Sequence, residues 1–271
     1  NQHSFNIIQT TMSDVKAIQD LVQKKESLKL EIAKIIVGQE AVVDQILLSI
    51  FSGGHALLVG VPGLAKTLMV NTISSALGLN FKRIQFTPDL MPSDILGSEI
   101  LDENRQFKFI KGPVFSNIIL ADEINRTPPK TQAALLEAMQ ERSVTIAGHN
   151  YKLDLPYFVL ATQNPIEQEG TYPLPEAQLD RFMFAIKLDY PTFQEEVMVV
   201  KSTTSNLKPV ITPLFTAQEI IDFQDLIRRI PVADNVIEYA VTLVGKTRPK
   251  GPLATDFVNN YLDWGAGPRA S

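Results

Sequence analysis

Hydrophobic and polar positions along the chain follow two periods, which together predict an α/β fold. Between residues 14 and 36, and again between 40 and 50, apolar residues recur at helical spacing among lysines and glutamates. Short apolar, strand-like runs then follow, mostly separated by helical patterns, at residues 56–59, 81–86, 117–121, 157–162 and 183–188. The run Ile118-Ile119-Leu120 has no polar position, which is typical of strands covered on both faces. We expect a mainly parallel sheet between helices, with functional groups at the carboxyl ends of its strands.

Two segments interrupt this alternation and predict β-hairpins. The first joins residues 99–102 to 107–110, and the second joins residues 143–147 to 151–153. After residue 190 the strand signal ends, and Thr192 and Thr216 each stand three residues before a glutamate, as in a capping box that opens a helix. The pattern therefore predicts an αβα core over residues 1–190 and a helical domain over residues 191–271. The chain starts without Met and stops shortly after Pro268, so we expect the helical domain to be cut short and the natural ends to lie elsewhere.

Composition narrows the possible classes of protein. A hydrophobic share of 45% and a charged share of 20% over 271 residues are globular values and exclude a disordered or fibrous chain. Cysteine is absent and the three histidines lie far apart, which argues against disulfides and a transition-metal site. A net charge of −5 disfavours a nucleic-acid partner. No apolar run is long enough to span a membrane and no secretory leader is visible, so we expect a cytoplasmic protein.

A glycine-rich loop lies between the first core strand and the helix predicted at residues 67–77. Its backbone N–H groups and the helix N-terminus could face a phosphate, Lys66 could add a positive charge, and the Thr67 hydroxyl could bind Mg²⁺. Ala65 replaces the glycine that usually precedes the lysine, and its Cβ disfavours a positive φ, so we expect a roughly helical backbone there. The alternative is a Gly/Pro turn that only caps a helix. The candidate nucleotide-binding residues here are Gly60, Val61, Pro62, Gly63, Leu64, Ala65, Lys66, Thr67 and Leu68.

Polar side chains follow two further core strands. Asp122 and Glu123 come directly after a buried run, where Asp122 could hold Mg²⁺ and Glu123 could deprotonate an attacking water. The alternative is a pair of solvated acids at the start of a loop. Asn164 ends another strand and could position the water, although Asn-Pro pairs also start turns.

Taken together, these segments resemble the MoxR family of AAA+ ATPases over nearly the whole chain. The matching segments are Gly38-Gln39-Glu40, Gly60–Thr67, Asp122–Arg126, Ala161–Pro165, Glu176–Phe182 and Gly265–Ala270. In that family Ala65 is the expected residue. The resemblance implies the sheet order 5-1-4-3-2, a C-terminal helical lid, and membership of the group with inserted hairpins that includes magnesium-chelatase ATPase subunits.

The resemblance also implies roles for residues that spacing alone does not assign. It adds Gly38 and Gln39 to the nucleotide-binding residues and makes Asn164 the sensor-1 residue. Arg181 becomes the arginine finger given to a neighbouring subunit, with Arg126 and Arg142 as rivals and a surface ion pair as the alternative. Arg269 becomes the sensor-2 arginine of the lid, and a solvent-facing arginine at a helix start is its alternative.

The implied function is Mg²⁺-dependent ATP hydrolysis in a homo-oligomeric ring, which we expect to be a hexamer. The ring would remodel or mature client proteins, for example by cofactor or metal insertion. A partner with a von Willebrand factor A domain is also implied, and the hairpins would be the effector surface. Two alternatives stay open. One is a nucleic-acid-directed motor or loader with Arg105, Lys108, Lys111 and Lys152 lining a channel. The other is a nucleotide-gated scaffold that does not hydrolyse ATP.

Overall fold

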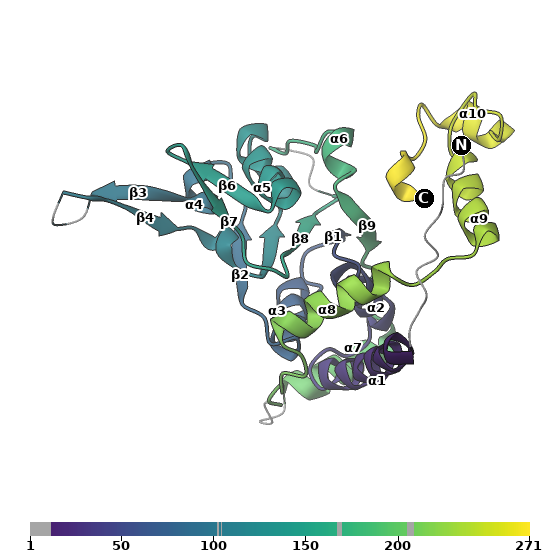
Figure 1. Cartoon of the computed structure of the whole chain (residues 1–271), viewed down its shortest axis with the longest axis horizontal. Helices are drawn as coiled ribbons and strands as arrows, with labels where there is room; N and C mark the ends of the chain where they lie inside the picture. Colours follow the sequence, from purple (N-terminus) through teal and green to yellow (C-terminus); the bar gives the residue numbers. More distant parts are fainter. Residues whose placement is uncertain (1–11, 102, 104, 167–169, 205–208) are drawn as a thin grey trace. The chain divides into compact units, whose positions relative to one another are not determined.

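The computed structural model describes residues 12–101, 103, 105–166, 170–204 and 209–271 (Figure 1). Its contacts divide the described residues into two compact units: one within residues 16–227, and one made of residues 228–271 together with residues 12–15. The sequence predicts a domain boundary at residue 191, because strands give way to helices there, and this boundary stays a prediction. Helix α7 (Phe193–Thr203) and nearly all of α8 (Ala217–Arg228) thus belong to the same compact unit as the sheet.

A five-stranded sheet forms the centre of the larger unit. Its strands are β1 (His55–Val59), β2 (Phe81–Gln85), β5 (Ile118–Asp122), β8 (Phe158–Gln163) and β9 (Phe182–Lys187). All neighbouring strands are parallel and their spatial order is β2-β5-β8-β1-β9. Counted among themselves and read from β9, these strands have the order 5-1-4-3-2, so the predicted fold class is confirmed. Each strand also starts and ends within one residue of its predicted run.

The two faces of the sheet carry separate hydrophobic cores. On β5, Ile118 and Leu120 belong to one core and Ile119 and Ala121 to the other, because successive side chains point to opposite faces. The first core is completed by α1 (Met12–Ala33), α2 (Glu40–Phe51), α3 (Lys66–Ala76) and α8. The second is completed by α4 (Pro92–Leu96), the 3₁₀ helix η1 (Pro113–Phe115) and α5 (Pro129–Glu141). Burial on both faces explains the uninterrupted apolar run.

Both predicted hairpins are present (Figure 1). Strands β3 (Gly97–Leu101) and β4 (Phe107–Lys111) form the first, and β6 (Ser143–Ile146) and β7 (His149–Lys152) form the second. Asp102, at the predicted end of one strand, lies outside the described residues. Gly97 has a φ of +96°, and a Cβ there would collide with the Ile110 carbonyl. The first hairpin therefore requires glycine at its base.

Helices account for every described element after β9. They are α7, α8, α9 (Asp234–Gly245), α10 (Asp256–Tyr261) and the 3₁₀ helix η3 (Pro268–Ala270). Both predicted capping boxes are present: the backbone N–H groups of Thr192 and Thr216 donate to Glu195 and Glu219 over 2.7 and 2.8 Å. Among the described residues, no helix has the length and apolar character needed to cross a bilayer.

Candidate active site

The glycine-rich loop lies where the sequence predicts it, between β1 and α3. Gly63 has a φ of +88°, a conformation that glycine adopts without strain. Ala65 has φ 53° and ψ 27°, so the prediction of a helical backbone there is wrong. The left-handed conformation costs an L-residue about 1–2 kcal/mol. It makes Ala65 the N-cap of α3, where its carbonyl accepts the N–H of Met69 over 2.9 Å.

Lys66, the first residue of α3, turns back over the loop. Its Nζ donates to the Gly60 carbonyl over 2.5 Å. Burial lowers the pKa of Lys66 below its ordinary value, and the negative charges of Asp122 and Glu123 partly oppose this shift. A partly desolvated ammonium in this position would be stabilised by a bound anion.

A cavity of about 380 Å³ opens beside the loop. Segments far apart in the chain line it: the loop itself, β2, and the carboxyl ends of β5 and β8. The lining residues are Pro62, Gly63, Leu64, Ala65, Lys66, Thr67, Arg83, Asp122, Glu123, Thr162 and Asn164. The strand-end residues therefore meet at one edge of the sheet, as expected for parallel strands.

Asp122 is held by donors from both neighbouring strands. Thr162 of β8 donates its hydroxyl to Oδ1 over 2.6 Å. Arg83 of β2 donates Nε and Nη2 to Oδ2 over 3.0 and 2.6 Å. Both carboxylate oxygens thus have partners within the chain, and the carboxylate faces the cavity with a fixed orientation.

Glu123 is fixed through its backbone and its side chain. It has a φ of +57°, an uncommon conformation for this residue type, and its N–H donates to the Thr162 hydroxyl over 2.8 Å. Its Oε2 accepts from Gln85 Nε2 over 2.9 Å and from Arg126 Nη1 over 3.1 Å. Backbone strain of this kind persists only where surrounding contacts impose it.

The donor set of the cavity suits magnesium. Thr67 and Asp122 supply hydroxyl and carboxylate oxygens, the ligands that Mg²⁺ prefers, and Mg²⁺ is usually bound by one or two carboxylates together with substrate phosphates. Within the part of the chain that the structure describes, no cluster of three or more His, Cys, Asp or Glu residues could hold a metal alone. A Mg²⁺ ion held by Thr67 and Asp122 would complete its coordination with water or substrate phosphates.

Asn164 is buried and lines the same cavity. Its Oδ1 accepts the N–H of Ile166 over 3.2 Å, as in a local turn. The amide therefore closes a turn and also borders the cavity, and its role in positioning a water stays a prediction.

A smaller cavity of about 150 Å³ adjoins the loop on its other side and is mostly apolar. It shares Gly63, Leu64 and Ala65 with the first cavity. Its other lining residues are Ile35, Ile36, Val37, Gln39, Leu68, Met69, Pro191, Val199, Ser202 and Thr203. Two predicted residues, Gln39 and Leu68, are thus brought to this side of the loop.

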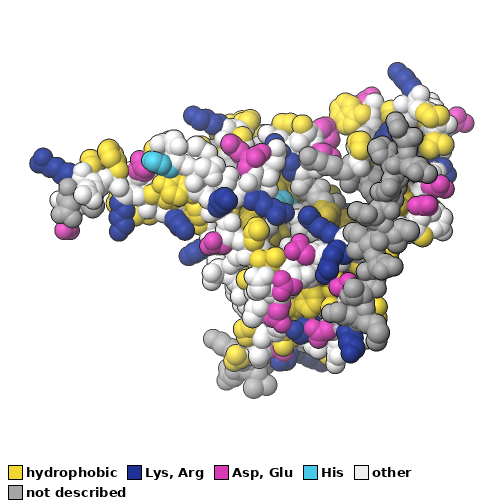
Figure 2. Space-filling model, viewed as in Figure 1, with side chains coloured by type: hydrophobic (Ala, Val, Ile, Leu, Met, Phe, Trp, Pro, Cys, Tyr) yellow, Lys and Arg dark blue, Asp and Glu magenta, His cyan; other side chains and the backbone are white. Residues whose placement is uncertain are grey.

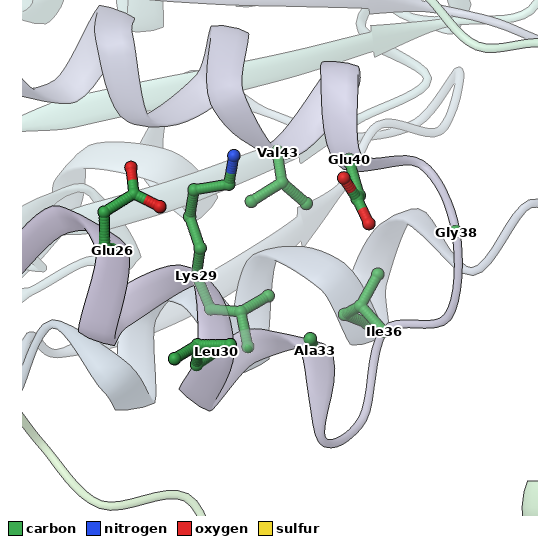
Figure 3. A pocket seen from close by; sticks show the side chains of 9 residues that line it. Glu26, Lys29, Leu30, Ala33, Ile36, Gly38, Glu40 and Val43 are labelled. Carbon is green, nitrogen blue, oxygen red and sulfur yellow. The ribbon is translucent and has the colours of Figure 1, made fainter.

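Other predicted nucleotide-binding residues do not line either cavity. Gly60 and Val61 start the loop, and Gly60 contributes the carbonyl that binds Lys66. Gly38 instead borders a separate cavity of about 230 Å³ between α1 and the start of α2, over which Lys29 and Glu40 extend (Figure 3). Gly38 has a φ of +69°, and a Cβ there would collide with the Glu195 carboxylate of α7.

The predicted arginines lie in different places. Arg181 is not among the residues found to line the cavity, and its Nη1 donates to the Leu136 carbonyl of α5 over 2.6 Å. Its rival Arg126 binds Glu123 of its own chain, and Arg142 ends α5 in a left-handed conformation. The backbone of Arg269 lies in η3, in the other compact unit, and its side chain lies outside what the structure describes.

Three residues around the carboxylates were missed by the sequence analysis: Arg83, Gln85 and Thr162. Arg83 and Gln85 alternate along β2, so both side chains lie on one face beside β5. The expected strand order already places the second strand next to the one that ends in Asp122. The sequence did hold a signal for Arg83 and Gln85, because a charged and an amide side chain are unusual inside a predicted core strand.

A parallel sheet of this order, with a glycine-rich loop before α3 and an acidic strand end beside it, defines a P-loop nucleotide-binding fold of the AAA type. The family described as "ATPase family associated with various cellular activities (AAA)" matches residues 55–184. A crystal structure of a Cytophaga hutchinsonii protein assigned as an ATPase superposes with a TM-score of 0.84 at 42% identity, covering 95% of this chain and 78% of that one.

Comparison with curated proteins specifies the family. "Chaperone MoxR1" of Mycobacterium tuberculosis is 45% identical over 92% of this chain and 66% of its own length. "Uncharacterized protein YeaC" of Bacillus subtilis is 48% identical over 80% of this chain and 68% of its own length. The chain belongs to the MoxR family of AAA ATPases. It spans about two thirds of the length of these two relatives.

Proposed function

We propose that this chain binds ATP with Mg²⁺ and hydrolyses it to ADP and phosphate. The observation that carries the proposal is the meeting of Lys66, Asp122 and Glu123 in one cavity at the carboxyl edge of a parallel sheet. A positive charge, a carboxylate able to bind metal and a second carboxylate able to accept a proton are the parts that phosphoryl transfer to water requires.

Binding would use the loop and the two cavities on its sides. The N–H groups of the loop and the Lys66 ammonium would hold the phosphates, and the mostly apolar cavity beside Leu68 would take the base. Thr67 and Asp122 would hold Mg²⁺, directly or through water. The metal, when bound, would neutralise charge on the phosphate oxygens.

Hydrolysis would divide the remaining roles between one subunit and its neighbour. Glu123 would take a proton from the attacking water, and Asn164 would orient that water. Arg181 would reach the terminal phosphate of an adjacent subunit, and Arg269 would reach the nucleotide of its own subunit. An arginine supplied in this way raises the rate by about 10³–10⁵ in phosphoryl-transfer enzymes.

The wider function we propose is remodelling or maturation of client proteins, with cofactor or metal insertion as one form of it, by a homo-oligomeric ring that we expect to be hexameric. One relative carries the name "Chaperone", which supports work on other proteins. Three hydrophobic side chains of the hairpin β3–β4 are exposed to solvent: Ile100, Leu101 and Phe107. The exposed fraction of Phe107 is 75%. Figure 2 shows hydrophobic and basic side chains next to each other on this hairpin, at the left of the view. Such a surface suits contact with another protein, and a partner with a von Willebrand factor A domain remains part of the proposal.

Phosphate release from ATP by the purified chain tests the enzymatic proposal. We expect turnover that requires Mg²⁺ and nearly stops in Glu123→Gln, while that variant still binds ATP. Turnover that is unchanged in Glu123→Gln would remove this residue as the base. ATP binding without any hydrolysis by the chain, alone or assembled, would favour a nucleotide-gated scaffold instead.

A further inference from the structure

We propose that Arg83 is a positioning residue that neutralises Asp122 when no divalent cation is present and competes with Mg²⁺ for this carboxylate. The proposal deepens the function proposed above and rests on it. It concerns what the carboxylate does before the metal arrives.

The geometry directs two donors of Arg83 at a single oxygen. Nε and Nη2 lie 3.0 and 2.6 Å from Asp122 Oδ2, and the other oxygen, Oδ1, accepts from Thr162. Nη2 also donates to Gln85 Oε1, so the guanidinium is held from two sides. A metal that uses Oδ2, directly or through water, must therefore share this oxygen with Arg83 or displace it.

Burial differs between the two partners in a way that favours release of the arginine. The Asp122 side chain is 14% exposed and that of Arg83 is 45% exposed. A largely buried carboxylate needs a counter-charge, whereas a half-exposed guanidinium can return to water at little cost. Arg83 can thus leave while Asp122 stays in place.

Electrostatics gives the proposal two consequences of opposite sign. With ATP but no metal, Arg83 lowers repulsion between the phosphates and Asp122, so its loss should weaken binding. With Mg²⁺, Arg83 repels the metal and occupies its ligand, so its loss should strengthen the response to the metal. A residue that only stabilises the fold would weaken both or change neither.

The experiment measures the Kd of ATP in EDTA, and the Mg²⁺ concentration that gives half of the metal-dependent gain in ATP affinity. In Arg83→Met we expect the Kd of metal-free ATP to rise about tenfold and the half-saturating Mg²⁺ concentration to fall about tenfold, the size of one charge-assisted hydrogen bond. Lys82→Met is the matched control, because it removes the same charge from the next residue of β2, which does not line the cavity. It should change neither quantity.

Shifts in the same direction, no shifts, or equal shifts in Lys82→Met would overturn the role of Arg83 while leaving the proposed function intact. A wild-type chain that binds no ATP with Mg²⁺ would overturn both. Arg83→Lys provides a second test should the methionine variant misfold. Since it keeps the charge but loses the fork, its metal-free Kd should stay near that of the wild type, and its half-saturating Mg²⁺ concentration should fall by a smaller factor. A metal-free Kd raised tenfold in Arg83→Lys would contradict the proposal.

Discussion

The hydroxyl of Thr162 donates a 2.6 Å hydrogen bond to Oδ1 of Asp122 and accepts the backbone N–H of Glu123. One side chain of β8 therefore fixes both acidic residues at the end of β5. Thr162 is almost fully buried, so water cannot replace these bonds if the hydroxyl is lost.

We predict that Thr162→Val lowers the free energy of unfolding by about 1–3 kcal/mol, because a carboxylate and an N–H lose their partner. Denaturant unfolding measures this change. Thr162→Ser is the matched control, since it keeps the hydroxyl and loses only a methyl group, at a cost of about 1 kcal/mol. A Thr162→Val variant as stable as the wild type would mean that the hydroxyl contributes nothing to the free energy of unfolding.

Lys66→Ala should abolish ATP binding. Among the described residues that line the cavity, Lys66 is the one lysine, so the variant loses the ammonium that would hold the phosphates. Titration with a fluorescent ATP analogue measures the affinity. Lys130→Ala, on the exposed first turn of α5, removes the same charge away from the cavity and should bind as the wild type does. An affinity that is unchanged in Lys66→Ala would refute the phosphate-binding role of the loop.

Arg181→Ala should bind ATP but lose hydrolysis by about 10³–10⁵ in rate, equivalent to about 4–7 kcal/mol of barrier. If the arginine acts on a neighbouring subunit, mixing Arg181→Ala with Glu123→Gln should restore phosphate release. A site that takes Glu123 from one variant and Arg181 from the other is then complete. No recovery at any mixing ratio argues that both residues act within one subunit.

Buried His55 predicts a pH dependence of stability. The pKa of His55 is lowered to about 4, mainly because the ring is buried. Its Nδ1 accepts the N–H of Val159 over 3.0 Å. The unfolded chain binds a proton near pH 6.5 that the folded chain does not bind until about pH 4. This group therefore stabilises the fold fully above pH 6.5, and its contribution falls as the pH drops towards 4, by up to about 3 kcal/mol.

The measurement is the difference in unfolding free energy between wild type and His55→Gln at several pH values. Since glutamine does not titrate, that difference should shrink steadily as the pH falls from 7 to 4. A difference that stays constant over this range would mean that His55 is not held neutral by the fold.

Stacked rings couple the two hairpins. The rings of Phe109 on β4 and Tyr151 on β7 have centroids 4.3 Å apart and planes inclined by 29°, and Phe115 packs edge-on against both. We predict that Phe109→Ala and Tyr151→Ala are not additive, with a coupling free energy of about 0.5–1.5 kcal/mol in a double-mutant cycle. Either single variant should also speed amide exchange in both hairpins. Additive losses, or faster exchange confined to the mutated hairpin, would contradict a coupled pair.

The pattern of apolar and polar residues correctly predicted features that depend on a few neighbouring residues. The uninterrupted Ile118-Ile119-Leu120 run predicted a strand buried on both faces, and the structure confirms it. The prediction failed at Ala65, because it considered the Cβ penalty alone, whereas Ala65 takes a left-handed conformation as the N-cap that starts α3. It also missed Arg83, since the importance of a residue on one strand came from its neighbour on another.

By itself, the sequence determined the class of fold, the order of its elements, the position of the glycine-rich loop and the identity of the acidic pair that follows β5. These follow from side-chain periodicity and backbone preference, which act over a few residues. Only the tertiary structure decided that Arg83 and Thr162 divide the two oxygens of Asp122, and that α7 and α8 belong to the compact unit of the sheet. Those relations depend on the register of parallel strands and on packing between segments far apart in the chain, which no short stretch of sequence encodes.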